Sequence, residues 1–220
     1  MHMGPQFVEL PFMAQFFSVH PANPQPRLMR RAADILRAGG VIVYPTDSCY
    51  ALGCHLGDKS AVERIRTIRQ VDRRHHFALV CRDLAEVGQY ASMDNRQFRL
   101  LKAVTPGSYT FLLRASREVP KRLQHPSRRT IGVRIPDHRV VRALLAELGE
   151  PVLSSTLHLP GDDRPLNDGA EIRTRLERAV DVILDCGSCG IVPTTVVDLT
   201  GETPVIVRRG RGSVVSLGLV

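Results

Sequence analysis

The sequence predicts one α/β (α+β) domain, built on a single twisted, mixed β-sheet with flanking helices. Stretches with the period of amphipathic helices alternate with short runs rich in β-branched and aromatic residues, a pattern typical of a sheet covered by helices. With 220 residues, 43% of them hydrophobic, the chain can bury a full core. No apolar run approaches the roughly 18 residues of a membrane span, so we expect no membrane association.

Residues 13–220 form the predicted domain, without internal repeats or low-complexity linkers. Residues 1–12 look unlike the sequence that follows, and we interpret them as a tag or an N-terminal extension, with Met13 as the natural start. No basic region followed by an apolar one opens the chain, so a secretory signal is not expected.

The central stretch runs from Gly39 to Gly53. The glycine pair favours a helix end, and residues 41–44 (Val-Ile-Val-Tyr) have the composition of a buried strand. Pro45 ends that strand because it cannot donate to a sheet ladder. Hydroxyl and carboxylate side chains follow at once, at the end of the strand where ligands bind in open α/β sheets.

Each remaining element follows from its local pattern. Residues 27–38 place Leu28, Ala32, Ile35 and Leu36 on one helical face, and Ser60 to Glu63 fits a capping box that starts the next helix. Further helices are expected at residues 84–89, 95–104, 140–148 and 168–178. Strands are expected at residues 16–19, 41–44, 77–81, 109–113, 130–135, 152–156 and 182–184, and within 191–199, with residues 205–210 closing the core as the last strand.

Arginine supplies nearly all the positive charge of the chain. The formal net charge is +8, and of 30 basic residues only Lys59, Lys102 and Lys121 are lysine. The fork of arginine suits phosphates and carboxylates, so the composition favours nucleic acid, nucleotides or an acidic partner, unless it reflects codon usage alone.

Cysteine usage indicates a reducing compartment. Five cysteines without regular spacing do not form a disulfide framework. Cys186 and Cys189 form a lone C-x-x-C without the second pair or histidines that zinc requires, so we predict free thiols, no metal site and a cytoplasmic location.

The densest basic patch comprises Arg64, Arg66, Arg69 and residues 73–76. Helical spacing spreads its arginines around the axis, so the patch is either a solvated face or a wall that binds anions. Arg134 interrupts an apolar strand, and arginine is rarely buried unpaired. It is either an edge residue or a pocket residue. We favour the pocket, in which case Arg134→Ala weakens ligand binding with little loss of stability.

Familiar catalytic signatures are absent. The sequence contains no P-loop, no G-x-S-x-G elbow, no H-E-x-x-H helix and no kinase motifs. What remains is a set of threonines and arginines at strand ends, which could converge on an anionic ligand.

These strand ends resemble the motifs of the YrdC-like family, the threonylcarbamoyl-AMP synthases. The stretch from Val43 to Gly53 resembles the family's P-T-D-T-x-Y-G-L signature. Four further matches follow in family order, at residues 105–110 (P-G-P-x-T), 131–136 (G-V-R-x-P), 193–198 (S-T-V-V-D) and 208–210 (R-P-G).

The resemblance implies a sheet around a large electropositive cavity. It further implies condensation of L-threonine, bicarbonate and ATP, with Mg²⁺, to threonylcarbamoyl-AMP and pyrophosphate, after which a partner enzyme modifies tRNA. By position, Thr46 would help hold threonine, and Arg134 would lie near its carboxylate or the phosphates. The remaining expected binding residues are Arg69, Thr110, Thr156, Thr194 and Arg208; a catalytic residue is not assigned.

Two departures from the family pattern place the chain nearest the YciO-type branch. The family's K-x-R is Arg69-Gln70-Val71 here, and its S-x-N is Thr156-Leu157-His158. Three functions follow as hypotheses: a synthase, a divergent enzyme that acts on a related nucleotide or hydrolyses the adenylate, and a non-catalytic module that binds double-stranded RNA or tRNA.

Overall fold

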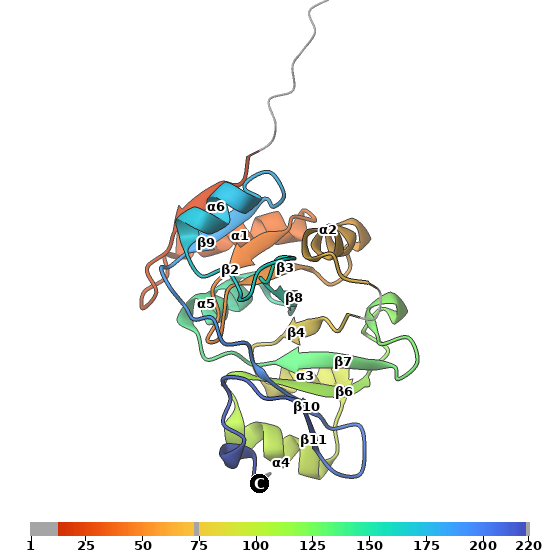
Figure 1. Cartoon of the computed structure of the whole chain (residues 1–220). Coiled ribbons are helices and arrows are strands. Elements are labelled where there is room, and N and C mark those ends of the chain that lie inside the picture. The colour runs from red at the N-terminus through yellow and green to blue at the C-terminus, as the bar shows by residue number, and fades with distance from the viewer. Residues whose placement is uncertain (1–12, 73–74, 219–220) are drawn as a thin grey trace, which may run out of the picture.

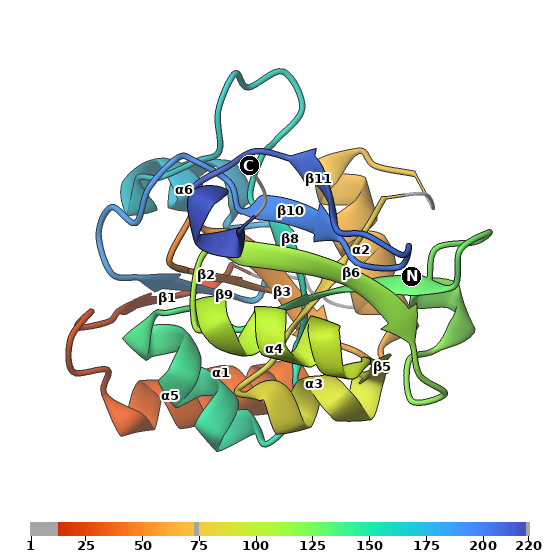
Figure 2. The ribbon, with the colours of Figure 1, turned by 90° about the horizontal axis from the view of Figure 1, so that it is seen from below.

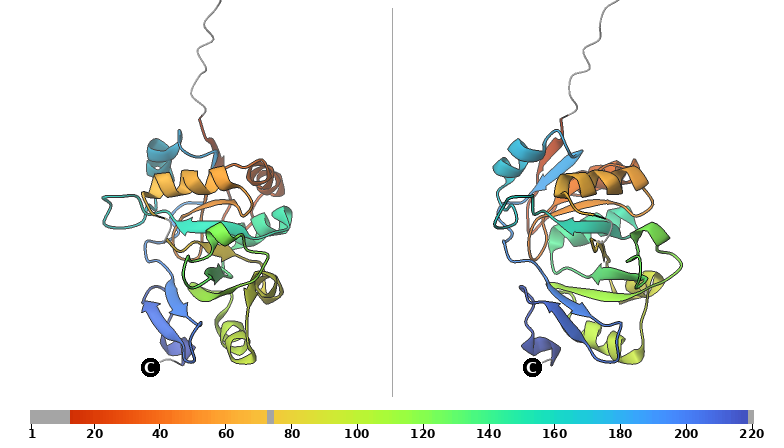
Figure 3. Two further views of the ribbon diagram at one scale, coloured as in Figure 1. Left: turned by 90° about the vertical axis from the view of Figure 1, so that its right-hand side faces the viewer. Right: turned by 45° about the vertical axis from the view of Figure 1, so that its right-hand side comes forward.

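The computed structural model describes residues 13–72 and 75–218, and the expected tag or extension at residues 1–12 lies outside these ranges. Eleven strands join in one mixed sheet in the order β1-β9-β2-β3-β8-β4-β7-β6-β10-β11, with β5 paired to β6. The α/β prediction is therefore confirmed (Figure 1). Both views of Figure 3 show the blue β10–β11 hairpin at the end of the molecule opposite the orange helix α2.

The helices and strands have the following bounds. The helices are α1 (Pro26–Arg37), α2 (Lys59–Arg69), α3 (Leu84–Tyr90), α4 (Asn95–Val104), α5 (Arg139–Leu148) and α6 (Gly169–Leu176). The strands are β1 (Gln15–Ser18), β2 (Ile42–Tyr44), β3 (Ala51–His55), β4 (Ala78–Val80), β5 (Ala91–Ser92), β6 (Tyr109–Ala115), β7 (Thr130–Arg134), β8 (Val152–Thr156), β9 (Val182–Asp185), β10 (Thr195–Asp198) and β11 (Val205–Arg208).

Two apolar clusters hold the helices on the sheet. One contains residues of α1 and α5 with Ile42, Tyr44, Val80 and Val152. Figure 2 shows α1 and α5 side by side on one side of the sheet and α6 on the other. The larger cluster joins residues of α2, α3, α4 and α6 to strand residues that include Val43, Leu79 and Leu153, which alternate with those of the first cluster. In that part of the chain which the structure describes, no helix has both the length and the apolarity needed to cross a membrane.

Three details differ from the sequence predictions. The buried face of α1 consists of Met29, Ala32, Ala33 and Leu36. Met29 and Ala33 thus take the places of Leu28 and Ile35 in the predicted face. Strand β3 was not predicted, because its alanine and glycine lack strand preference. Strand β11 does not close the core: it forms the sheet edge, where Val205 and Val207 are 56% and 57% exposed.

The predicted capping box at residues 60–63 is wrong. The N-cap of α2 is Asp58, whose carboxylate accepts hydrogen bonds from the amide of Ala61 and the hydroxyl of Ser60, each at 2.8 Å. Those bonds hold the pKa of Asp58 below its usual range. The helix starts earlier than predicted because the carboxylate of Asp58, two residues before Ser60, is the better acceptor.

Asp58→Ala is therefore expected to lower the free energy of unfolding by about 1 kcal/mol, the usual value of an N-cap. Glu63→Ala removes the side chain of the rejected capping box and should change stability by less than about 0.5 kcal/mol. Urea unfolding of the two variants checks the assignment, and equal losses would contradict it.

Candidate functional site

A cavity of about 560 Å³ lies where β4, β6, β7, β8, β10 and β11 approach the segment after α2. Six of the seven residues singled out from the sequence line it: Arg69, Thr110, Arg134, Thr156, Thr194 and Arg208. Segments far apart in the chain therefore meet at one cavity, and Thr46 lies just outside its lining.

Strand alternation directs these side chains into the cavity. Thr110 on β6 and Val196 on β10 line it, whereas their neighbours Phe111 and Val197 belong to the core. On β7, Gly132 clears the cavity floor, because a Cβ atom there would lie 2.9 Å from the carbonyl oxygen of Phe77 and 3.2 Å from Cγ2 of Thr110.

Arg134 is a buried pocket residue, so the pocket interpretation is confirmed. Its strand β7 lies between β4 and β6 rather than at an edge, and the residue is only 6% exposed. Its Nη2 donates to Oδ1 of Asp47 at 2.9 Å and to Oγ of Ser48 at 3.1 Å. Its buried Nε has no partner among the described residues, which leaves a donor for a bound anion.

Thr46 lies behind Arg134 and organises the loop after β2. Its buried hydroxyl donates to the carbonyl of Cys49 at 2.6 Å, and it accepts from the amides of Ser48 and Cys49. Nη2 of Arg134 lies 3.4 Å away. The geometry gives Thr46 a positioning role for Asp47 and Ser48, which in turn hold Arg134.

A second arginine is held at the cavity by two threonines. Arg208 donates from Nη2 and Nε to the carbonyl of Thr194, at 2.9 and 3.2 Å. The hydroxyls of Thr194 and Thr110 lie 2.8 Å apart. This arrangement joins the ends of β6, β10 and β11 into one polar corner.

Arg69 takes the place of the family's lysine, but it is partly engaged by the protein. Its Nη1 donates to Oγ of Ser155 at 2.8 Å and to the carbonyl of Thr156. Its Nε is buried without a partner among the described residues. Val71 does not line the cavity, and Arg73 and Arg74 lie outside the described residues. Of the predicted basic patch, Arg66 serves structure instead, because it is buried over the ring of Phe77 and donates to the carbonyl of Asp72.

Three arginines reach the cavity lining, and one of them, Arg134, is paired with Asp47 behind the lining. Among the described lining residues, three are arginines and none is Asp or Glu. Burial lowers the pKa of both Arg69 and Arg208, and nearby arginines lower it further. Arginine nevertheless stays charged in proteins. An anion in the cavity would stabilise the charged form of both guanidinium groups.

Several polar residues at the cavity were not among the seven residues named as the site. Ser155 and His75 lie at its wall with 3.0 Å between Oγ and Nε2, and Asp47 fixes Arg134 from behind. The signal for Asp47 was its place beside Thr46, directly after β2. No pattern in the sequence indicated that His75 would meet Ser155 across 80 residues.

His75 should make stability depend on pH. Burial, and then the charge of Arg69, lowers the pKa of His75 to about 4, whereas an unfolded histidine titrates near about 6.5. Between these values only the unfolded chain binds the proton, so the free energy of unfolding should fall as pH drops through this window. Urea unfolding at pH 7.5, 6 and 5 should show a smaller fall for His75→Gln; an identical fall would contradict this contribution.

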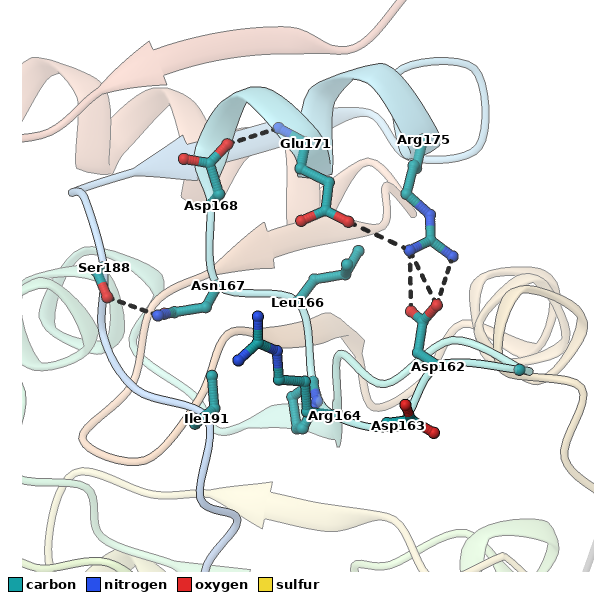
Figure 4. Close-up of a pocket in the computed structure, with 12 residues that line it drawn as sticks. Asp162, Asp163, Arg164, Leu166, Asn167, Asp168, Glu171, Arg175, Ser188 and Ile191 are labelled. Carbon is teal, nitrogen blue, oxygen red and sulfur yellow. Dashed lines mark hydrogen bonds and ion pairs between the residues drawn. The ribbon is translucent and has the colours of Figure 1, made fainter.

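A second cavity of about 670 Å³ lies between residues 161–168, the start of α6 and the segment after β9 (Figure 4). It contains the carboxylates of Asp162, Asp163, Asp168 and Glu171. Arg175 donates three hydrogen bonds of 3.0 or 3.1 Å to the carboxylate of Asp162, and its Nη1 lies 3.5 Å from Oε1 of Glu171. None of the seven predicted site residues lines this cavity.

Comparison with known proteins assigns the family. A family model for Sua5, YciO and YrdC proteins, described as telomere recombination, matches residues 34–210. The chain belongs to the Sua5/YciO/YrdC family. It is 54% identical to the uncharacterized protein YciO of Escherichia coli K12, over 92% of this chain and 98% of that protein. The crystal structure of E. coli YciO superposes with a TM-score of 0.90 and covers 93% of this chain and 100% of the other.

More distant family members have names that state an activity or a ligand. A threonylcarbamoyl-AMP synthase of Chromobacterium violaceum is 35% identical over 64% of this chain and 73% of that protein. A crystal structure of P. abyssi Sua5 complexed with L-threonine is 25% identical, with a TM-score of 0.81, over 89% of this chain and 57% of the other. The resemblance inferred from the five motifs is thus confirmed at the level of the family.

Proposed function

We propose that the 560 Å³ cavity binds ATP and L-threonine, and that the protein condenses them with bicarbonate to form threonylcarbamoyl-AMP and pyrophosphate. The observation that carries this proposal is the convergence of Arg69, Arg134 and Arg208 on one cavity whose described lining contains no carboxylate. Two names add support: the L-threonine in the Sua5 complex and the synthase activity of the C. violaceum relative.

The chemistry requires orientation and charge neutralisation more than a nucleophile from the protein. Three substrates must meet with correct geometry, and negative charge develops on the pyrophosphate as it leaves. Arg208, at the polar corner with Thr110 and Thr194, is proposed to bind the phosphates. Arg134 offers Nε to the carboxylate of threonine or to a phosphate, while Asp47 and Ser48 hold its other end.

Mg²⁺ enters this proposal as part of the substrate MgATP. Magnesium is commonly held by substrate phosphates, waters and one or two carboxylates. Since no Asp or Glu is found among the described lining residues, phosphate oxygens and water are the proposed ligands. The product would pass in the cytoplasm to a partner enzyme that transfers the threonylcarbamoyl group to tRNA.

One assay tests the proposed function. Purified protein is incubated with MgATP, bicarbonate and L-threonine, and pyrophosphate and the carbamoyl adenylate are both measured. Formation of both products, dependent on threonine, is the expected result. Pyrophosphate without threonine would indicate plain ATP hydrolysis, and loss of added threonylcarbamoyl-AMP without synthesis would indicate the hydrolase hypothesis.

RNA binding is a separate proposal, favoured by a basic surface. Arg114, Arg128 and Arg129 line a further cavity of about 670 Å³ at the edge of the sheet. Binding of tRNA or double-stranded RNA there should weaken steeply as salt rises. Nucleotide binding in the partly buried cavity should depend less on salt, so titrations of both ligands at 50 and 200 mM salt separate the two.

A further inference from the structure

The candidate pocket contains a histidine where the sequence departs from the family's S-x-N motif. His158 lines the 560 Å³ cavity together with His75, His76 and the three arginines. The family resemblance places an asparagine at this position, and an amide cannot accept a proton at neutral pH. The exchange therefore adds acid–base capacity to the site.

The contacts of His158 define which ring nitrogen carries the hydrogen. Its Nε2 lies 2.7 Å from the backbone carbonyl oxygen of Asp162. Since a carbonyl oxygen only accepts hydrogen bonds, Nε2 must carry the hydrogen. In the neutral ring the lone pair is then on Nδ1, and Nδ1 makes no hydrogen bond to any residue that the structure describes.

His75 is a poorer candidate for the same task. Its Nε2 is engaged with Oγ of Ser155 at 3.0 Å. Burial and Arg69 lower the pKa of His75 to about 4, so it is a weak base. We interpret it as a neutral hydrogen-bonding partner in the pocket wall.

Asp162 is itself held in place on the far side of its loop. Its carboxylate pairs with Arg175 of α6, at 3.0 and 3.1 Å, as Figure 4 shows. The same residue thus fixes His158 through its carbonyl and is anchored through its side chain. Arg175 is therefore a positioning residue for the imidazole of His158, because it holds the loop whose carbonyl oxygen contacts Nε2.

We propose that Nδ1 of His158 is the general base that removes a proton from the ammonium group of bound L-threonine. The amine then attacks the carbon of bicarbonate, forming the N–C bond and releasing water, and the resulting carbamate attacks the α-phosphorus of ATP as pyrophosphate leaves. The proton on His158 passes to solvent. This inference rests on the proposed synthase function.

Glutamine is the informative replacement at this position. His158→Gln keeps an amide nitrogen near the place of Nε2, able to donate to Asp162, and removes the base. We expect kcat to fall about 10²–10³-fold, while dissociation constants for ATP and threonine stay within twofold. His55→Gln, on a surface histidine paired with Glu150, is the matched control and should retain wild-type kcat.

Variants of the other groups in the cavity test whether the loss of kcat is specific to His158. The charged and titratable groups that line the cavity with His158 are Arg69, His75, His76, Arg134 and Arg208, and the Asp162 carboxylate faces Arg175. If Nδ1 of His158 is the base, His75→Gln and His76→Gln should lower kcat far less than His158→Gln does. Arg175→Met should lower kcat with KM unchanged, and Arg175→Lys should restore part of it.

A second measurement separates failure of this inference from failure of the proposed function. If the wild-type protein forms no adenylate, the synthase function is wrong. The ¹⁵N NMR spectrum of His158 still decides whether Nε2 carries the hydrogen and whether threonine perturbs Nδ1. A hydrogen on Nδ1 of the neutral ring, an unperturbed Nδ1 with threonine bound, or an active wild type matched by His158→Gln would each overturn the role of His158.

Discussion

Replacing Arg134 with alanine should lower the free energy of unfolding by about 3 kcal/mol, because removal of one partner leaves a buried charge unpaired. The carboxylate of Asp47 lies 2.9 Å from Nη2 of Arg134, and both side chains are more than nine-tenths buried. We also expect binding of ATP to weaken, since the free Nε donor disappears with the guanidinium. This result differs from the small stability loss expected from the sequence, which treated Arg134 as a pocket cation without a structural partner.

A double-mutant cycle tests the explanation. Asp47 keeps contacts from the hydroxyl of Ser108 and the amide of Asp137, so Arg134→Ala should still yield a folded protein. Asp47→Ala combined with Arg134→Ala should cost about 1–3 kcal/mol less than the sum of the single changes. Arg142→Ala breaks an exposed ion pair with Asp137 and should cost less than about 1 kcal/mol. Additive losses at Asp47 and Arg134 would contradict the buried-pair account.

Arg208→Ala should raise the dissociation constant for ATP by roughly 10- to 150-fold, which corresponds to about 1.5–3 kcal/mol for a charge-assisted hydrogen bond. The side chain reaches the cavity across the ends of β10 and β11, where it is held by Thr194. Arg208 is exposed on the edge strand β11, so the melting temperature should change little.

Arg209 provides a matched control for this measurement. It is the next residue along the chain, it is also exposed, and it does not line the cavity. Calorimetric titration of ATP into Arg208→Ala and Arg209→Ala should give weaker binding only in the first. Similar losses would mean that general positive charge, rather than the polar corner with Thr110 and Thr194, attracts the nucleotide.

The elements that sequence reasoning predicted best have strong local signals. Residues 152–156 and 95–104 were predicted with the bounds that β8 and α4 have, because a turn or a capping residue flanks each apolar pattern. Strand β3 escaped prediction because its order comes from pairing with β2 and β8 rather than from its own residues. Strand β11 is exposed because it lies at the edge of the sheet, and the amino-acid composition of a strand does not indicate its position in the sheet.

The site was predicted in part for the same reason. Threonines and arginines near strand ends stand out in a sequence, and the motifs indicated seven residues at one site, six of which line the cavity. Partners that come from elsewhere in the chain could not be predicted. Asp47 was visible as a polar residue, but its ion pair with Arg134 spans 87 residues. The contact between His158 and Asp162 depends on the path of a loop.

A crystal structure with a non-hydrolysable ATP analogue and L-threonine tests the central claim most directly. The account predicts both ligands in the cavity lined by Arg69, Arg134 and Arg208, with phosphate oxygens within hydrogen-bond distance of Arg208. A nucleotide bound instead in the cavity of Asp162 and Arg175, or on the basic surface around Arg128, would contradict it.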